Sequence, residues 1–285
     1  MSRPQPPTKT RRPDLKDAAQ SAIDAQQHDG TSRQDTTESS TPDQATHSNG
    51  STGTLHLIPV GLGDADPSVW LPPAVQSLAA TLDCYIAENA KTARAFLKQI
   101  GTHHALQSIS IHTLDERSND AQLRRWLMPL EQGRDIGLVS DAGCPAVADP
   151  GARVVALAHT LGYPVVPHVG PSSILLGIMA SGLDGQRFAF HGYAPIPPAE
   201  RARQLRDWEQ VSRRDRQTQI LIETPYRNSA MFHTLLQSLK GNTRLCVARS
   251  LTTPRAWIRT LSIEQWKQAP QPDLDKQPCL FLFLA

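Results

Sequence analysis

The sequence predicts an α/β fold built as two α/β domains. Short apolar runs rich in β-branched residues alternate with segments of helical periodicity, which is typical of proteins with largely parallel sheets. The chain of 285 residues is long enough for two ordinary domains. Because Pro167, Gly170 and Pro171 interrupt the pattern before it restarts, we expect an N-terminal domain over 54–168 and a C-terminal domain over 169–285.

The first 53 residues are predicted to be a disordered tail. They contain no Phe, Trp or Tyr and no sustained apolar period, so they cannot offset the entropy of becoming ordered. They lack the apolar segment of a secretory signal and carry too many acids for an organelle transit peptide. No run of about 18 apolar residues occurs in the chain, so we expect a cytoplasmic protein without a membrane span.

In the N-terminal domain, short apolar runs predict strands over 55–60, 84–88, 108–113, 136–139 and 163–169. Helices are expected between them, near 72–82, over 91–101 where Gly101 ends the helix, over 118–132 and from 152 onward. The helix over 118–132 is favoured because Leu123, Trp126, Leu127 and Leu130 recur at steps of three and four residues.

In the C-terminal domain, a helix over 172–181 is followed by strands over 187–193, 218–223 and 244–251, with helices between them. The first of these intervening helices is rich in arginine, and the second is expected over 228–240. The segments AWIRTL and CLFLFLA near the end are too short for helices and are suited to a mixed sheet.

The turn PVGLGDADP over 59–67 follows a strand and contains Gly61 and Gly63, so it partly matches the dinucleotide fingerprint G-x-G-x-x-G. Asp66 occupies the position of the third glycine, which would allow the helix to pack closely. The sequence of this segment therefore favours a plain tight turn and not a binding site for a nicotinamide or flavin cofactor.

The segment SDAGCPAVADPG over 140–151 is a stronger candidate site, since ligands of open α/β sheets bind beyond the carboxyl ends of strands. Gly143 permits a positive φ and Pro145 stiffens the loop. Asp141 is the side chain best suited to meet a ligand, whereas Asp149 is expected to cap the following helix.

Other chemistries are poorly supported. The cysteines Cys84, Cys144, Cys246 and Cys279 form no CxxC pair, the histidines have no metal spacing, and there is no G-x-S-x-G elbow. We therefore expect reduced thiols, no metal site and no hydrolase, and helix capping is the default role of Ser172 and Ser173.

Two groups of charged residues each have two interpretations. Glu223, Arg227 and Arg249 follow strands, where they could line a cleft or form structural ion pairs. The net charge of +2 identifies no partner. The arginine-rich helix could contact a phosphate backbone or be an ordinary solvated face; its arginines are Arg201, Arg203, Arg206, Arg213, Arg214 and Arg216.

The ordered segments GLVSDAGCPAVADPG, VVPHVGPSSI, ASGL, RFAFHGYAP, IETPYR and VARSLT resemble the tetrapyrrole methylase superfamily. Within it, they are most similar to the ribosomal RNA small subunit methyltransferase I branch, and the resemblance runs from about Leu55 to the C-terminus. It implies two α/β domains, usually in a homodimer, with S-adenosyl-L-methionine bound in the cleft between the domains.

The resemblance also implies site residues and a reaction, the methylation of a ribose 2′-hydroxyl in ribosomal RNA. By motif match, cofactor contacts fall on Gly61, Gly63, Ser140, Asp141, Ala142, Gly143, Cys144, Pro145, Ser172, Ser173, Glu223, Ala248 and Leu251. Asp141 and Glu88 are the candidates for assisting proton removal, and Arg249 for charge complementarity. RNA, from the small ribosomal subunit, is the expected partner.

The chain departs from the branch at several positions. ENAKTARAFL replaces a pattern like E-D-T-R-H-T, GDADP leans towards the tetrapyrrole enzymes, and Cys144 replaces a usual Thr. Two alternatives therefore stay open: a methyltransferase of the same fold that acts on a tetrapyrrole or another small molecule, and a binding module that keeps the fold without transferring methyl groups.

Overall fold

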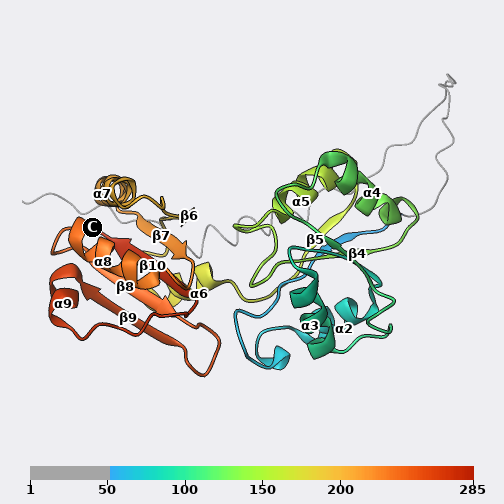
Figure 1. The fold of residues 1–285 in the computed structure, drawn as a ribbon, viewed down its shortest axis with the longest axis horizontal. Coiled ribbons are helices and arrows are strands. Elements are labelled where there is room, and N and C mark those ends of the chain that lie inside the picture. The colour runs from blue at the N-terminus through green and yellow to red at the C-terminus, as the bar shows by residue number, and fades with distance from the viewer. Residues whose placement is uncertain (1–51) are drawn as a thin grey trace, which may run out of the picture. The chain divides into compact units, whose positions relative to one another are not determined.

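The computed structural model describes residues 52–285. Its first sheet has five strands in the order β3-β2-β4-β1-β5 (Figure 1). All of its strand pairs are parallel. The strands are β1 (Leu55–Leu57), β2 (Cys84–Ala87), β3 (Ser110–Thr113), β4 (Ile136–Val139) and β5 (Val165–Pro167).

Helices cover both faces of this sheet. The pair α2 (Pro73–Thr81) and α3 (Ala90–Ile100) lies on one side, and the pair α4 (Asp120–Glu131) and α5 (Gly151–Thr160) on the other (Figure 1). A short 3-10 helix, η1 (Pro67–Val69), precedes α2. Side chains alternate along β2, so that Tyr85 joins the core beneath α2 and α3 while Ile86 joins the core beneath α4 and α5.

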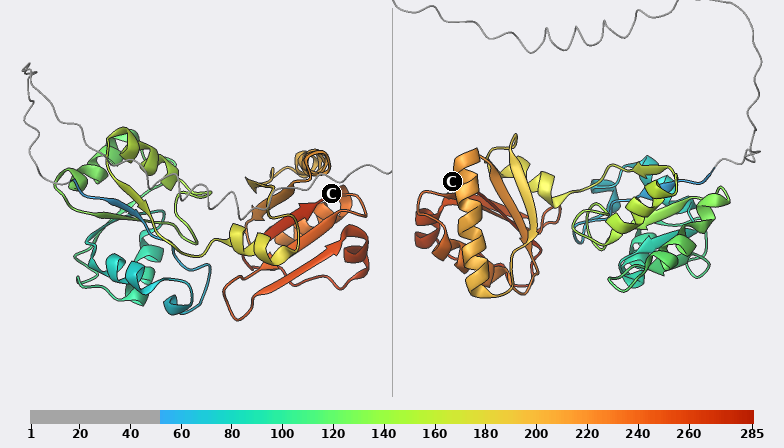
Figure 2. Two further views of the ribbon diagram at one scale, coloured as in Figure 1. Left: turned by 180° about the vertical axis from the view of Figure 1, so that it is seen from behind. Right: turned by 90° about the horizontal axis from the view of Figure 1, so that it is seen from above.

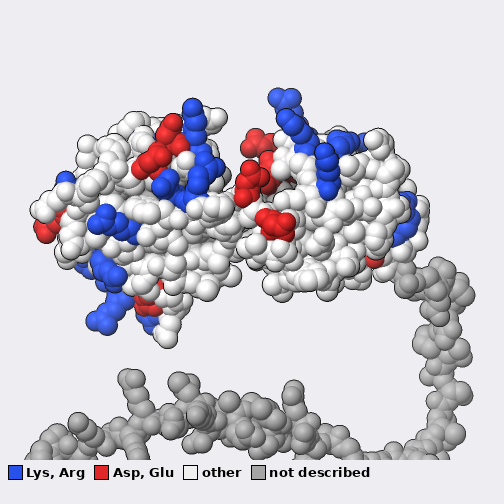
Figure 3. Space-filling view, turned by 90° about the horizontal axis from the view of Figure 1, so that it is seen from below, with Lys and Arg blue, Asp and Glu red and all other residues white. Residues whose placement is uncertain are grey.

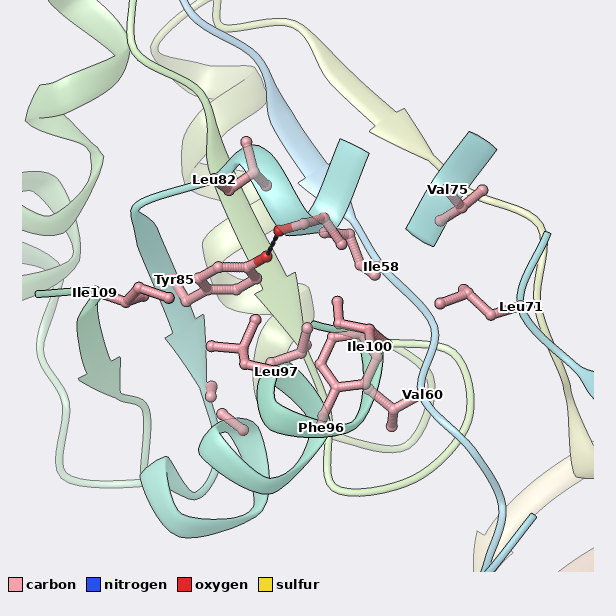
Figure 4. Packing of buried hydrophobic residues seen from close by; sticks show 14 of the residues in the cluster. Ile58, Val60, Leu71, Val75, Leu82, Tyr85, Phe96, Leu97, Ile100 and Ile109 are labelled. Carbon is pink, nitrogen blue, oxygen red and sulfur yellow. Dashed lines mark hydrogen bonds between the residues drawn. The ribbon is translucent and has the colours of Figure 1, made fainter. Parts of the chain in front are cut away.

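The core beneath α2 and α3 is organised around Tyr85, which is fully buried. Its hydroxyl donates a hydrogen bond of 2.5 Å to the carbonyl oxygen of Ala79, so the one polar atom of the ring is satisfied (Figure 4). On β4, a Cβ atom at Gly137 would lie 2.4 Å from the Tyr85 ring. Glycine is therefore required at this position for the ring to fit.

The second sheet is mixed, with the strand order β6-β7-β10-β8-β9. Only β6 and β7 pair in parallel, and the other neighbours are antiparallel. The strands are β6 (Phe188–Tyr193), β7 (Thr218–Glu223), β8 (Arg244–Arg249), β9 (Trp257–Ser262) and β10 (Cys279–Leu284). The helices are α6 (Ser173–Ser181), α7 (Pro198–Asp215), α8 (Asn228–Ser238) and α9 (Ile263–Gln268).

The two faces of the second sheet have separate cores. Leu221 and Phe281 point towards α7 and α8, and the long helix α7 lies across the strands in Figure 2. Ile220, Ala248 and Leu280 point to the opposite face, where α6 packs. Because α6 covers only part of that face, the ends of β6, β7 and β8 remain available to line a site.

The expected order of strands and helices is confirmed, with differences in detail. The short elements η1 and α9 were not expected, and β1, β3, β5 and β8 are shorter than the runs that predicted them. The second sheet departs from the largely parallel pairing expected from the alternation of strands and helices, and the mixed sheet expected from the two terminal segments is confirmed. Strand β9 follows β8 without an intervening helix and pairs with it antiparallel, and β10 pairs antiparallel with both β7 and β8.

The arginine-rich helix is confirmed as α7, but Arg201 is wrong as a phosphate contact. This side chain is buried, with Nε donating to Thr234 Oγ1 at 3.2 Å and one terminal nitrogen donating to the carbonyl oxygen of Ile196 at 3.2 Å. Arg201 joins α7 to α8. The other arginines of this helical segment, Arg203, Arg206, Arg213, Arg214 and Arg216, are exposed.

The predicted tail lies outside the described residues, except for its last two positions. Gly53 is buried, and its backbone N–H donates to the carbonyl oxygen of Leu130 at 2.8 Å. Within residues 52–285, none of the helices has the length and apolar character needed to cross a membrane.

Candidate functional site

A cavity of about 610 Å³ lies where the carboxyl end of the first sheet meets the uncovered part of the second sheet. One side of the cavity is lined by Leu62, Glu88 and the loop after β4. The rest is lined by the start of α6 and by the ends of β6, β7 and β8. A volume of this size is typical of small-molecule sites.

Most of the residues that the sequence indicated as a site line this cavity. They are Glu88, Ser140, Asp141, Ala142, Gly143, Cys144, Ser172, Ser173, Glu223, Ala248 and Leu251. Gly61, Gly63, Pro145 and Arg249 are not among the lining residues. Gly61 and Gly63 instead flank Leu62, which does line it, and Pro145 is buried behind the loop.

The loop after β4 is fixed to the turn after β1. Val60 and Gly143 exchange two backbone hydrogen bonds, of 2.9 and 3.2 Å, in an isolated bridge. Gly143 has a φ of +75°, which glycine adopts without steric cost. The two segments that the sequence singled out, 59–67 and 140–145, thus form one wall of the cavity.

Asp149 shapes the second half of this loop. Its carboxylate accepts hydrogen bonds from the backbone N–H groups of Ala146 and Gly151, at 2.9 and 2.6 Å. Ala146 and Ala148 have φ values of +67° and +61°, which are strained for residues with a Cβ atom. The formal N-cap of α5 is Pro150, so the expected capping role needs correction: Asp149 braces the whole turn and also lines the cavity.

Glu88 lies on the cavity wall between two other acids. Its Oε1 accepts a hydrogen bond of 3.1 Å from the backbone N–H of Asp141. Burial raises the pKa of Glu88, the carboxylates of Asp149 and Asp141 raise it further, and the hydrogen bond from Asp141 opposes both effects. A carboxyl with a raised pKa beside a cavity is a candidate general base.

Glu223 and Arg227 form the structural ion pair that was one of the two interpretations. The guanidinium of Arg227 donates to Glu223 Oε1 at 2.5 Å. The other carboxylate oxygen, Oε2, is buried and has no hydrogen-bond partner among the described residues. Glu223 is among the residues that line the cavity, but its carboxylate is enclosed by the protein, so its role there is to hold Arg227 and the end of β7.

Arg249 lies behind the cavity wall. Its guanidinium is 3.9 Å from the carboxylate of Asp273 and 5.7 Å from the ring centre of Trp257. These contacts are those of a structural arginine that stacks on an aromatic ring.

The charge of the cavity is one-sided. Four acidic residues line it, Glu88, Asp141, Asp149 and Glu223, of which Glu223 is paired with Arg227, and the lining includes no Lys, Arg or His. The face of the molecule in Figure 3, by contrast, carries scattered basic groups with acidic groups between them. The cavity is therefore suited to a cation and unsuited to a ligand that is held through phosphates.

Comparisons with known proteins agree with this geometry. The family model described as Tetrapyrrole (Corrin/Porphyrin) Methylases matches residues 54–266. The chain belongs to this methylase family. Its members are methyltransferases, and the family implies S-adenosylmethionine as the methyl donor.

Two curated relatives of this methylase carry the name ribosomal RNA small subunit methyltransferase I. The protein from Xylella fastidiosa is 33% identical over 204 residues, which cover 70% of this chain and 69% of that protein. The protein from Pseudomonas aeruginosa is 27% identical over 227 residues, which cover 80% and 76%. The solved structure of the methyltransferase CobJ matches 82% of the chain with a TM-score of 0.55 and 17% identity, a likeness that concerns the fold.

Several cavity residues of the methylase were not indicated individually by the sequence. Four of them belong to the segments RFAFHGYAP and IETPYR, which carried the family resemblance: Phe190, Tyr193, Thr224 and Pro225. Membership of these segments was the sequence signal that could have identified them as cavity residues. Cys279 and Leu280 come from the last strand, where an apolar run gave no indication of a site.

Proposed function

We propose that this methylase transfers a methyl group from S-adenosyl-L-methionine to a ribose 2′-hydroxyl in the RNA of the small ribosomal subunit. The observation that carries the cofactor assignment is the cavity lined by Glu88, Asp141 and Asp149, with no Lys, Arg or His among its lining residues. The RNA substrate is supported by the names of the relatives and by the exposed arginines of α7.

The cavity fits the chemistry of the cofactor. S-adenosylmethionine is a sulfonium cation without phosphates, and it supplies an electrophilic methyl group together with its thioether leaving group. Asp141 and Asp149 provide negative charge on one wall of the cavity. Leu62, Ile222 and Leu280 offer apolar surface for a flat base.

Glu88 is the residue that we assign to proton removal. As the oxygen–methyl bond forms and the carbon–sulfur bond breaks, the hydroxyl proton passes to the Glu88 carboxylate. The hydrogen bond from the Asp141 backbone holds this carboxylate in position. The remaining task of the chain is to align the hydroxyl with the methyl group.

The cofactor assignment predicts stoichiometric binding of S-adenosylmethionine in calorimetry, and a purified protein that does not bind it would contradict the proposal. The substrate assignment predicts that small subunits from a strain lacking the gene accept one labelled methyl group. Nuclease digestion and mass spectrometry then locate this group on a ribose. Cofactor binding without turnover on these subunits would favour a non-catalytic binding module instead.

A tetrapyrrole substrate is the second candidate, because the family also contains enzymes for such macrocycles. Biological tetrapyrroles carry many carboxylates, which the acidic lining of the cavity would repel. Methylation of a tetrapyrrole, but not of subunit RNA, would select this alternative.

We also propose that α7 contacts RNA phosphates through its exposed arginines. Arg203, Arg206 and Arg213 recur at intervals that bring them to one side of the helix. Replacing both Arg203 and Arg206 by glutamate is expected to weaken RNA binding. It should also reduce the magnitude of the slope of the logarithm of the binding constant against the logarithm of the salt concentration by about 1–2. The measurement is a salt titration of binding, and an unchanged slope would remove α7 from the interface.

A matched control changes the same charge elsewhere in the same domain. Lys240 and Lys267 are exposed near the ends of α8 and α9, so their double replacement by glutamate alters the net charge equally. If the control flattens the salt dependence as much as the α7 variant, the effect reflects net charge and not a contact.

We further propose a cytoplasmic homodimer. A ribosomal substrate requires access to ribosomal subunits, and two apolar side chains on α6, Leu175 and Met179, are exposed by 54% and 78% one helical turn apart. Light scattering of the purified protein tests the dimer, and a monomeric mass at micromolar concentration would exclude it.

A further inference from the structure

Strand β6 contains a bulge at the edge of the cavity. Along β6, Phe190 lies opposite Ile220 of β7 and Tyr193 lies opposite Ile222, so three steps on one strand match two on the other. Gly192, within this interval, has a φ of +65°. One extra residue in a strand reverses the alternation of the side chains that follow it.

The bulge determines where Tyr193 points. In a regular strand, residues 190 and 193 would lie on opposite faces of the sheet. Here both Phe190 and Tyr193 line the cavity, while His191 between them stacks on Trp208 of α7 with ring centres 4.1 Å apart. His191 Nε2 also lies 2.7 Å from Gln219 Oε1, which holds the bulge to β7.

Phe190 and Tyr193 thus form an aromatic wall with a buried and an exposed end. Phe190 is half-buried against the cluster that contains Ile220 and Leu280. Tyr193 is 52% exposed, although it is among the residues that line the cavity. An exposed aromatic ring of this size at the mouth of a cavity is available to stack on a flat ligand.

We propose that this wall stacks on the base of the nucleotide whose ribose is methylated. The inference rests on the proposed function, and it names the part of the RNA that enters the site. Aromatic side chains are the usual platforms for unpaired bases, because every base has a π face. Tyr193 therefore contributes to substrate binding rather than to the chemical step.

The adenine of the cofactor has the same flat chemistry, but the position of Tyr193 favours the RNA base. Ala248, Leu251 and Leu280 make up the buried wall of the cavity, where a small molecule can be enclosed. Tyr193 instead lies at the exposed rim, and the chain continues from it into α7, where Arg203 and Arg206 face solvent. A base on Tyr193 and phosphates along α7 can belong to one strand of RNA.

The test compares Tyr193→Ala with Tyr193→Phe, and Tyr226→Ala serves as a matched control. Tyr226 is 80% exposed and adjoins the cavity residue Pro225, but it is not part of the lining. Tyr193→Ala is expected to raise the KM for small subunits about tenfold or more and to leave the Kd for S-adenosylmethionine within about twofold. Tyr193→Phe and Tyr226→Ala should resemble the wild type.

A second measurement does not depend on turnover. Small-subunit RNA that contains 5-iodopyrimidines, irradiated with the wild-type protein, should cross-link to Tyr193 or Phe190, and Tyr193→Ala should lose the Tyr193 adduct. A cross-link map without either residue would overturn the proposal. So would a Tyr193→Ala variant with a weakened cofactor Kd and an unchanged KM for RNA, because the wall would then belong to the cofactor.

Failure of this inference can be told apart from failure of the proposed function. If wild-type protein methylates the subunits and Tyr193→Ala has the same KM, only the aromatic wall is wrong. If wild-type protein methylates no RNA, the proposed function fails, and the cross-link map still decides whether the wall contacts bases.

Discussion

Replacing Glu88 by glutamine is expected to lower kcat about 10²–10⁴-fold, which is the usual contribution of a general base. Glutamine keeps an oxygen that can accept the hydrogen bond from the Asp141 backbone, now 3.1 Å long, so the loop geometry should persist. It cannot take up a proton from the attacking hydroxyl. Calorimetry should therefore give a wild-type Kd for S-adenosylmethionine, while single-turnover methylation becomes slow.

The pH dependence gives this prediction a second measurement. Burial and the neighbouring acids Asp149 and Asp141 raise the pKa of Glu88 from its ordinary value of 4.5. The wild-type rate should increase with pH up to this raised pKa and then level off, and this limb should vanish in Glu88→Gln. The exposed neighbour Asp141 supplies the control, because Asp141→Asn keeps the backbone N–H that donates to Glu88. If Asp141→Asn lost as much activity as Glu88→Gln, Asp141 would be the general base.

The same pKa shift makes a prediction about stability. Since the folded state raises the pKa of Glu88, native Glu88 binds its proton more tightly than unfolded Glu88 does. The ionised carboxylate therefore reduces stability above the raised pKa, and this penalty disappears as the pH falls below the ordinary value. Glu88→Gln should be at least as stable as the wild type at about pH 7.5, with a smaller difference at about pH 4. Urea denaturation at both pH values measures the effect.

The elements that the sequence predicted well are those with local causes. Helix α3 ends where Gly101 adopts a φ of +74°, and strand β7 spans the predicted residues 218–223. Helix α9 was missed although Ser262 and Gln265 form a capping box, because its six residues are too few for a periodic signal.

The features that could not be predicted depend on distant partners. The burial of Arg201 depends on Thr234, which is 33 positions away, and the bulge that turns Tyr193 into the cavity is visible only in the register with β7. Within one segment, by contrast, the loop over 140–145 follows a strand of a parallel sheet, and its position at the sheet's carboxyl end follows from that order. The sequence therefore predicted the wall formed by the loop over 140–145 more completely than the wall that contains Tyr193.

The second large effect is expected from Asp149→Ala. Two residues of this loop, Ala146 and Ala148, have positive φ values, a conformation that costs roughly 1–3 kcal/mol for each residue with a Cβ atom. The Asp149 carboxylate compensates by accepting hydrogen bonds from the N–H groups of Ala146 and Gly151, and bonds to a charged acceptor contribute about 1.5–3 kcal/mol each. Without the carboxylate, the strained turn loses these two hydrogen bonds and is expected to relax, which changes the wall of the cavity.

We therefore expect Asp149→Ala to raise the Kd for S-adenosylmethionine at least about tenfold, since 1.4 kcal/mol corresponds to a factor of ten. Asp149→Asn should lose less, because its amide oxygen can still accept the 2.6 Å hydrogen bond from Gly151. Asp141→Asn is the control for charge, since it removes one carboxylate from the same wall without removing a brace. Calorimetry on the three variants separates the two roles of this loop. Equal losses of affinity in all three variants would mean that the negative charge of the wall holds the cofactor. A loss that is largest in Asp149→Ala, smaller in Asp149→Asn and smallest in Asp141→Asn would mean that the shape of the turn holds it.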